Sequence, residues 1–471
     1  MKSIDPKDIS IDPASYVDPS GRVFKWEGST YRAIALDRSH FFTHLVSEVI
    51  HRCPELRRAF VETEITDLTL DGYGLILKHR TISFPSYCVE WPPPILKEAA
   101  LHTLRIASLL AQHGLMLQDA HPWNIFFEGP KPRFIDLGSV VPASEGLLWP
   151  AYDQFCHFFL YPLYLSAAGL SEVARSLLYD YINGISGELC RTLLPTSYKL
   201  RHPRTFSRLI LPQVLTQLSR RWGFEDRIRS WSTSLGAGSD LAGTRQRFFE
   251  ALLKEVEGIQ LPRRSTEWSA YYTGPASSAS TSDLTAKDET IRRVLQATRP
   301  ETIFDMGCNV GRYAVLAATV GSRVVACDRD VTCVSLLYQQ SRERNLDILP
   351  LVIDVANPTP AFGWCGRQYP SALDRFQVDM VFASALVHHL AIRQYHDFAR
   401  IIGTLKAFTK RWLLVEFVGQ DDPKARIMIA RSLRDFSWYD LKSFMKALEQ
   451  HFKKVKILES YSESRTLLLC E

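Results

Sequence analysis

The chain has 471 residues, 46% of them apolar and 23% charged, which is enough for two or three domains with cores of their own. Its net charge of +5 is small, and no run of Lys and Arg with interleaved aromatics indicates a nucleic-acid groove. Nine cysteines occur without a C-x-x-C pair, which argues against a disulfide framework and a zinc site and favours a reducing cytoplasm. The N-terminal MKSIDPKDISIDPAS lacks the apolar core of a signal peptide.

The first predicted elements are two strands in GRVFKWEGSTYRAIAL, with Gly21 in a reduced phosphate loop. A helical stretch follows from Phe41 to His51, and a longer one from Ile95 to His113 has apolar residues at helical spacing. A third apolar stretch, Phe155 to Leu170, is interrupted by Pro162 and is too short to span a bilayer. We expect it to be a buried helix.

Between these helices, LQDAHPWNIFFEGPKPRFIDLG places Asp119 shortly before Asn124 and puts Asp136 at the end of a strand. This segment resembles the catalytic loop and metal loop of the α+β protein-kinase-like fold. The resemblance implies that Asp119 orients an acceptor hydroxyl, that Asn124 binds a metal, and that Asp136 holds the Mg²⁺ of Mg-ATP.

The N-terminal half departs from the kinase pattern at the positions that grip phosphate. The lysine of V-A-I-K is absent, so that only Arg32 or Lys78 could replace it, with Glu48 as a partner. Leu117 stands where the His of H-R-D is expected. Active phosphoryl transfer, a nucleotide-binding or regulatory remnant and a purely structural domain are the three interpretations, and we expect binding without turnover.

A segment rich in Pro, Ser, Thr and Gly, residues 261–287, separates the two halves and is predicted to be a linker or lid. An amphipathic helix is expected over residues 288–297. The predicted domains are therefore 1–260, the linker 261–287, and 288–471. Tyr271, Tyr272 and Lys287 are candidate lid contacts.

Residues 302–330, TIFDMGCNVGRYAVLAATVGSRVVACDRD, predict a strand, a tight turn, a helix and a second strand. Asp305 ends the first strand, Asp328 ends the second, and the turn contains Gly307, Asn309 and Gly311. The glycines leave the backbone open to a ligand, and Asn tolerates a left-handed conformation. An acid at the end of the second strand can accept both ribose hydroxyls, as in dinucleotide sites.

Because an acid precedes the first glycine and no G-x-G-x-x-G is present, the site suits an ammonium group better than a pyrophosphate. The segment resembles the cofactor loop of class I S-adenosylmethionine-dependent methyltransferases, which implies a Rossmann-like seven-stranded sheet. Later residues agree: LPLVIDV from Leu349 as the third strand, VDMVFASALVHHL from Val378 as the fourth, WLLVEF from Trp412 as the fifth, and a final antiparallel hairpin from Lys454 to Leu469.

The resemblance assigns several residues to a cofactor site, and for some of them a structural role is the alternative. Asp330 is the rival of Asp328, Asp354 could be a simple turn residue, and His388 and His389 could both be structural. The expected S-adenosylmethionine contacts, with no metal among them, are Asp305, Gly307, Cys308, Asn309, Gly311, Asp328, Arg329, Asp354, Val355, Ser384 and Lys287.

His389, then His388, and Glu416 on the fifth strand are the candidate general bases, because ligands lie beyond the carboxyl ends of such strands. No N/D-P-P-Y motif and no Pro-Cys follows the fourth strand, which favours O-methylation of a small molecule or glycan. The chain as a whole resembles the nodulation protein NoeA group, which implies a role in making a secreted signal or cell-surface molecule. The alternatives are a small-molecule phosphotransferase and a non-catalytic nucleotide- or cofactor-binding regulatory protein.

Overall fold

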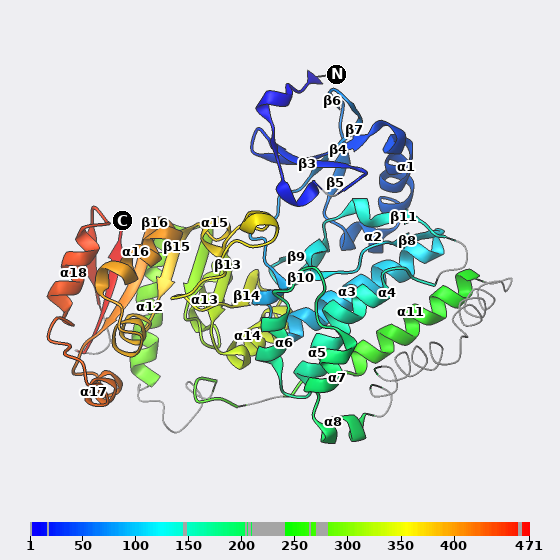
Figure 1. The fold of residues 1–471 in the computed structure, drawn as a ribbon. Coiled ribbons are helices and arrows are strands. Elements are labelled where there is room, and N and C mark those ends of the chain that lie inside the picture. The colour runs from blue at the N-terminus through cyan, green and yellow to red at the C-terminus, as the bar shows by residue number, and fades with distance from the viewer. Residues whose placement is uncertain are drawn as a thin grey trace. The chain divides into compact units, whose positions relative to one another are not determined.

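The computed structural model describes residues 2–16, 18–144, 148–202, 241–262, 265–269, 281–459 and 464–471, together with Thr205 and Leu209. The chain divides into two compact units (Figure 1). Unit 1 comprises residues 1–127, 132–262 and 363–369, and unit 2 comprises residues 128–131, 263–362 and 370–471. The boundaries 1–260, 261–287 and 288–471 for separately folding domains stay a prediction.

Unit 1 begins with a five-stranded antiparallel sheet in the order β2-β3-β4-β7-β5. A tight turn joins β3 to β4 with positive φ at Glu27 and Gly28, which fits the right-handed twist of a hairpin. Phe24, Tyr31 and Ile76 form the centre of its core. The strands are β2 (Ser10–Ile11), β3 (Gly21–Trp26), β4 (Ser29–Ala35), β5 (Thr63–Ile65) and β7 (Tyr73–His79), and β1 (Lys2–Ser3) pairs with β6 (Leu68–Thr69).

In unit 1, a group of short helices follows β4, and most of the chain after β7 is helical. After β4 come η3 (Leu36–Arg38), α1 (Ser39–His44), the π-helix η4 (Leu45–Ile50) and α2 (Pro54–Ala59), while η1 (Pro6–Asp8) and η2 (Pro13–Ser15) precede β3. The later helices are η5 (Cys88–Glu90), α3 (Pro93–Gln112), α4 (Tyr152–Phe155), η8 (Cys156–Leu160), α5 (Tyr161–Ala167), α6 (Ser171–Leu177), α7 (Gly187–Leu193), α8 (Thr196–Arg201) and α11 (Leu241–Gly258).

Short strands between α3 and α4 carry the loops with Asp119 and Asp136. β8 (Leu115–Leu117) pairs antiparallel with β11 (Val140–Pro142), and β9 (Ile125–Glu128) pairs with β10 (Lys131–Phe134). The 3-10 turns η6 (Pro122–Asn124) and η7 (Leu137–Ser139) lie in the loops themselves. The long helix α3 packs against both α11 and β8, so a buried helix lies beneath these loops.

Unit 2 is built on a seven-stranded sheet in the order β14-β13-β12-β15-β16-β18-β17. The first five strands in this order are parallel and β18 is antiparallel to β16 and β17, as expected from the resemblance to class I methyltransferases. The strands are β12 (Thr302–Met306), β13 (Arg323–Asp328), β14 (Ile348–Val352), β15 (Val378–Ala383), β16 (Thr409–Val418), β17 (Val455–Leu458) and β18 (Arg465–Cys470).

Helices cover this sheet because its strand residues alternate between two apolar faces. Ile303 and Met380 share a core with α12, α13 and α14, whereas Phe304 packs edge-on against Phe376 and Phe408 on the other face. The helices are α12 (Thr281–Thr298), α13 (Arg312–Thr319), α14 (Val331–Glu343), η9 (Trp364–Gly366), α15 (Ala372–Arg375), η10 (His389–Arg393), α16 (Phe398–Phe408), α17 (Pro423–Ala430) and α18 (Leu441–Glu449).

Two expectations about element boundaries are wrong. Residues 281–287, predicted as linker, form the start of α12, so Lys287 lies on a helix. The third strand ends at Val352, so Asp354 lies in the following turn, where its backbone oxygen accepts from Asn357. Among the described helices, none combines the length and apolar character that crossing a membrane would require.

Candidate functional site

The turn from β12 into α13 has the left-handed conformations that its sequence predicts. Gly307, Asn309 and Gly311 have φ of 75°, 53° and 83°. A Cβ atom on Gly311 would lie 2.2 Å from Cδ1 of Leu337 on α14, so glycine is required there for close packing of protein against protein. At Gly307 the corresponding distance to Leu386 is 3.3 Å. Leu337 therefore occupies the position that a side chain at residue 311 would take, and a contact of the Gly311 backbone with a cofactor stays a prediction.

Asp305, the last residue but one of β12, carries a buried carboxyl group. Its side chain is 1% exposed, and its Oδ2 has no hydrogen-bond partner in the described structure. Burial raises the pKa of Asp305 to about 7, against the opposing effects of the backbone of Ala314 and the charge of Lys287. An unpartnered carboxylate oxygen of this kind is costly unless a donor or cation meets it.

Asp328 and Asp330 have different partners. Asp328 accepts from the backbone nitrogens of Asn309 at 2.9 Å and of Asp330 at 2.9 Å, which ties the end of β13 to the turn after β12. Asp330 caps α14 by accepting from the backbone nitrogens of Thr332 and Cys333. Asp330 therefore has a structural task, and the side chain that faces the turn is Asp328.

Three other expected cofactor contacts, Asp354, Val355 and Cys308, differ in their surroundings. Asp354 accepts from the backbone nitrogen of Ala356, and its carboxylate forms an ion pair at 3.4 Å with the largely exposed Arg329. Val355 is buried. Cys308 is buried as well, and burial raises the pKa of its thiol well above the ordinary value, so it is neutral at pH 7.

Lys287, Ser384 and Glu416 meet in a buried polar cluster that brings α12 to the carboxyl ends of β15 and β16. Nζ of Lys287 lies 2.6 Å from Oγ of Ser384 and 2.7 Å from Oε2 of Glu416, and Ser384 also donates to that oxygen at 3.0 Å. Lys287 also lies over the ring of Tyr313, 4.9 Å from its centroid. The cluster links three elements far apart in the sequence.

Glu416 is fully buried, and its Oε1 has no partner among the described residues. Burial would raise its pKa, but the charges of Lys287 and Arg465 and the hydrogen bonds from Lys287 and Ser384 outweigh burial and hold the pKa below its usual value. A carboxylate stabilised in its ionised form is a weak base. Glu416 thus acts as the counter-ion of Lys287 in this arrangement.

His388 and His389 lie at the start of η10, just beyond the end of β15. Burial lowers the pKa of His389 to about 4 and that of His388 well below the usual value, with nearby positive charges adding to both effects. Both rings are therefore neutral at pH 7 and able to accept a proton. His388 is buried with an unpartnered Nδ1, whereas His389 is only partly buried.

Trp268 joins this site, and our sequence reasoning did not include it. Its ring meets that of His389 edge-on at 5.3 Å, and its carbonyl oxygen accepts from Nδ2 of Asn309 at 2.9 Å. A single tryptophan in a Ser- and Thr-rich segment gave no periodic signal that could have identified it. Tyr271 and Tyr272, which we considered as lid contacts, lie outside the described residues.

In unit 1 the candidate metal loop is held by a buried arginine. Arg32 on β4 is 5% exposed and donates to Asp18 and to Asp136, each at 2.7 Å. Asp136 also accepts from the backbone nitrogen of Gly138, and a Cβ atom on Gly138 would lie 2.7 Å from both Arg32 and Asp18. The guanidinium therefore occupies the centre of the site between two carboxylates.

Asp119 and Asn124 belong to the same loop region. Burial raises the pKa of Asp119, and the charges of Asp136 and Asp18 add to the rise, so the three acids lie within electrostatic reach of one another. Asn124 is buried with an unpartnered Nδ2, and its backbone oxygen accepts from Ile135, next to Asp136. In the described part of the chain, no group of three or more His, Cys, Asp or Glu residues is arranged to hold a metal ion.

Three other expectations for unit 1 are wrong. Glu48 pairs with Arg52 on the surface and not with Arg32. Lys78 is exposed on β7 and does not replace the missing lysine. Gly21 lies in strand β3 opposite Ile34, where a Cβ atom would lie 2.0 Å from the backbone oxygen of Ala33, so it serves close strand packing and not a phosphate loop.

No protein-family model matches the chain. Solved structures with similarity to it are the magnesium protoporphyrin IX methyltransferase ChlM from Synechocystis with bound SAH (TM-score 0.30, 14% identity, 40% of this chain and 83% of that chain) and the bifunctional kinase-methyltransferase WbdD (0.30, 14%, 43% and 42%). Scores of this size do not establish a common fold. The nodulation protein NoeA of Rhizobium meliloti is 27% identical over 467 residues, covering 97% of this chain and 95% of that protein. Over nearly its whole length, the chain is therefore a homologue of the nodulation protein NoeA.

Proposed function

We propose that unit 2 is an S-adenosylmethionine-dependent methyltransferase. The observation that carries the proposal is Asp305, a buried carboxylate with an unpartnered oxygen beside a left-handed turn. The cationic methionine end of the cofactor would supply the missing partner. Asp328 fits the ribose, because each of its oxygens accepts one backbone N–H and a carboxylate has capacity for about four hydrogen bonds.

When bound, S-adenosylmethionine supplies a methyl group on a sulfonium, which is already a good leaving group. The chain then needs to align an acceptor, and orientation alone contributes on the order of 7 to 11 kcal/mol. His389 is neutral and only partly buried, so it can take the proton of an acceptor hydroxyl as the new O–C bond forms. With a pKa of about 4 His389 is a weak base, so it accepts this proton only as the hydroxyl becomes acidic in the transition state.

The proposed acceptor is a hydroxyl group, because of the residues that lie near the carboxyl ends of β15 and β16. Glu416 is committed to Lys287, which leaves the partly buried His389 as the proposed proton acceptor. A hydroxyl of a small molecule or glycan suits such a base. The name of the NoeA homologue supports a role in nodulation, and hence in making a signal or cell-surface component.

Calorimetric titration of the full chain with S-adenosylmethionine tests the cofactor site. Asp328→Asn should weaken binding about ten- to hundredfold, because it removes charge-assisted hydrogen bonds. Asp330→Asn is the matched control, and because Asn caps a helix about as well as Asp, it should change both helix stability and affinity little. A larger loss for Asp330→Asn would show that the ribose acid is misassigned.

For unit 1 we propose a kinase-like domain that does not turn over ATP. What supports the proposal is a five-stranded antiparallel sheet with helices between its third and fourth strands in sequence, followed by the loops of Asp119 and Asp136. Arg32 is already paired with Asp136, the residue that would hold Mg²⁺, and with Asp18. A nucleotide would have to displace both contacts before its phosphates could be positioned, and positioning is nearly all that phosphoryl transfer requires of a protein.

A further inference from the structure

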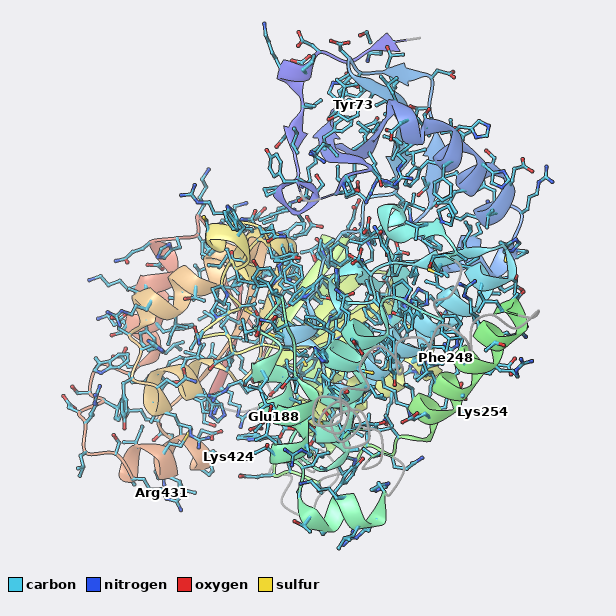
Figure 2. All side chains as sticks on the ribbon, turned by 45° about the vertical axis from the view of Figure 1, so that its right-hand side comes forward. Tyr73, Glu188, Phe248, Lys254, Lys424 and Arg431 are labelled. Carbon is cyan, nitrogen blue, oxygen red and sulfur yellow. The ribbon has the colours of Figure 1, made fainter. Side chains whose placement is uncertain are left out.

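An exposed patch of mixed character lies on α17 and the segments next to it. Three apolar side chains are exposed, Ile427 at 52%, Tyr395 at 43% and Leu433 fully. Three exposed arginines, Arg426, Arg431 and Arg434, lie on the same segment (Figure 2 labels Arg431 at the end of α17). We call these six residues the α17 surface. Exposed apolar groups among cations typically mark an interaction site.

The α17 surface has an ordered base. Asp422 caps α17 and forms a buried ion pair with Arg465 on β18 at 2.9 Å. Ala425 is buried, whereas Arg426, Ile427, Ala430 and Arg431 are exposed, so one side of the helix faces the unit and the other faces outward. Tyr395 joins the patch because the guanidinium of Arg434 lies 3.8 Å from the centroid of its ring. This contact joins one arginine to one apolar side chain, while Arg426 also lies 3.9 Å from the exposed Asp421.

The patch also lies beside the candidate acceptor site. α17 contacts η10, the helix that begins at His389. The charges of Arg393 and Lys424 contribute to the lowered pKa of His389, which places these cations within electrostatic reach of the candidate base. A macromolecular surface bound at α17 would therefore lie near His389.

We propose that the α17 surface binds the face of an anionic lipid bilayer. Arginines next to a bilayer are attracted by its anionic headgroups, and apolar side chains gain by entering the boundary between headgroups and acyl chains. A small hydrated anion would satisfy the arginines but would leave Ile427 and Leu433 in water. The headgroup region of an anionic bilayer offers anionic groups to the arginines and, a few ångströms deeper, an apolar environment to Ile427 and Leu433.

Co-sedimentation of the full chain with phosphatidylcholine vesicles, with and without phosphatidylglycerol, tests this inference and does not depend on methyl transfer. Binding should require phosphatidylglycerol and weaken with salt. Arg431→Gln with Arg434→Gln should lower the partition coefficient roughly fivefold for each arginine. Ile427→Ser with Leu433→Ser should lower it at least about tenfold.

The control combines Leu336→Ser with Arg344→Gln, which removes one exposed leucine and one exposed arginine at α14 and should leave binding unchanged. Equal loss in the control, or equal binding to vesicles with and without phosphatidylglycerol, overturns the inference. Release of vesicle-bound protein by inorganic phosphate at matched ionic strength would show a site for free anions instead. Retention on DNA without binding to vesicles would point to nucleic acid, and would also overturn it.

Discussion

Asp305 makes the proposed cofactor site sensitive to pH. Its carboxyl group has a pKa of about 7, raised by burial, so that it is about half protonated at neutral pH before a ligand binds. A cationic ligand favours the ionised form, and a proton must therefore leave on binding at lower pH. We expect the affinity for S-adenosylmethionine to fall about tenfold for each pH unit below 7.

Titration calorimetry at several pH values in buffers of different ionisation enthalpy would measure this proton release. Asp305→Asn should weaken binding at pH 8 and remove most of the pH dependence. A pH dependence that survives in Asp305→Asn would assign the titrating group to another residue.

Lys287 and Glu416 form a pair whose separate loss is expected to destabilise unit 2. Lys287→Met leaves a fully buried carboxylate without its cation, which typically costs about 3 to 5 kcal/mol. Adding Glu416→Leu to Lys287→Met removes the uncompensated charge and should recover much of that loss. Urea unfolding of the single and double variants measures the difference, and an equally unstable double variant would contradict the explanation.

The sequence located the residues of this site that lie within one short segment. Asp305, the turn and Asp328 occur in a single strand-turn-helix-strand stretch, where local spacing sets geometry. By contrast, the sequence predicted Glu416 to be a candidate general base. Its partner Lys287 is 129 positions away and was expected in a linker, so the ion pair could not be foreseen. No local pattern predicts which distant cation a buried acid will meet.

At the scale of elements, the close approach of α13 and α14 depends on Gly311. Gly311→Ala combines an unfavourable φ of 83° with a clash against Leu337, and overpacking of this kind costs about 1 to 3 kcal/mol. Gly321→Ala is the matched control, since Gly321 also has positive φ but nothing lies within 4 Å of its Cβ position. Thermal or urea unfolding should show Gly311→Ala as the less stable variant.

Equal stability of the two glycine variants would show that Leu337 can move aside. For the same reason, the variant Gly307→Val would not be a clean test of cofactor binding. With φ of 75° at Gly307 and Leu386 at 3.3 Å, the valine would strain the turn itself, so a loss of affinity would not separate ligand contact from backbone distortion.

Most helices and strands could be predicted from the spacing of apolar residues, because a helix buries one face and a central strand buries both. The order of the sheet in unit 2 agrees with the sheet expected from the resemblance. The boundaries were less predictable: α12 begins in a Ser- and Thr-rich stretch, and its packing on α13 outweighs the weak helix preference of those residues. The phosphate loop predicted at Gly21 is wrong for a related reason. In a sequence, a glycine required for strand packing cannot be distinguished from one required for a ligand.

For the molecule as a whole, we expect chemistry in only one of the two units. Asp119→Asn and Asp136→Asn alter the loop region of unit 1, whereas every residue in the proposed cofactor site belongs to unit 2. The affinity of these variants for S-adenosylmethionine should therefore stay within about twofold of the parent chain. A larger change would show that the state of unit 1 affects the methyltransferase site.

The last prediction is that the full chain does not transfer the γ-phosphate of ATP. Arg32 pairs with both Asp136 and Asp18 at 2.7 Å, so Mg²⁺ would have to compete with a buried guanidinium for the carboxylate of Asp136. Burial and the charges of Asp136 and Asp18 raise the pKa of Asp119, so a loss of its function is not the expected cause; the expected obstacle is the occupied metal-binding carboxylate. Incubation with radiolabelled ATP and Mg²⁺ should give labelled product at no more than the rate of a heat-denatured control. Transfer that Asp119→Asn and Asp136→Asn each abolish would contradict this expectation and establish unit 1 as a working phosphotransferase.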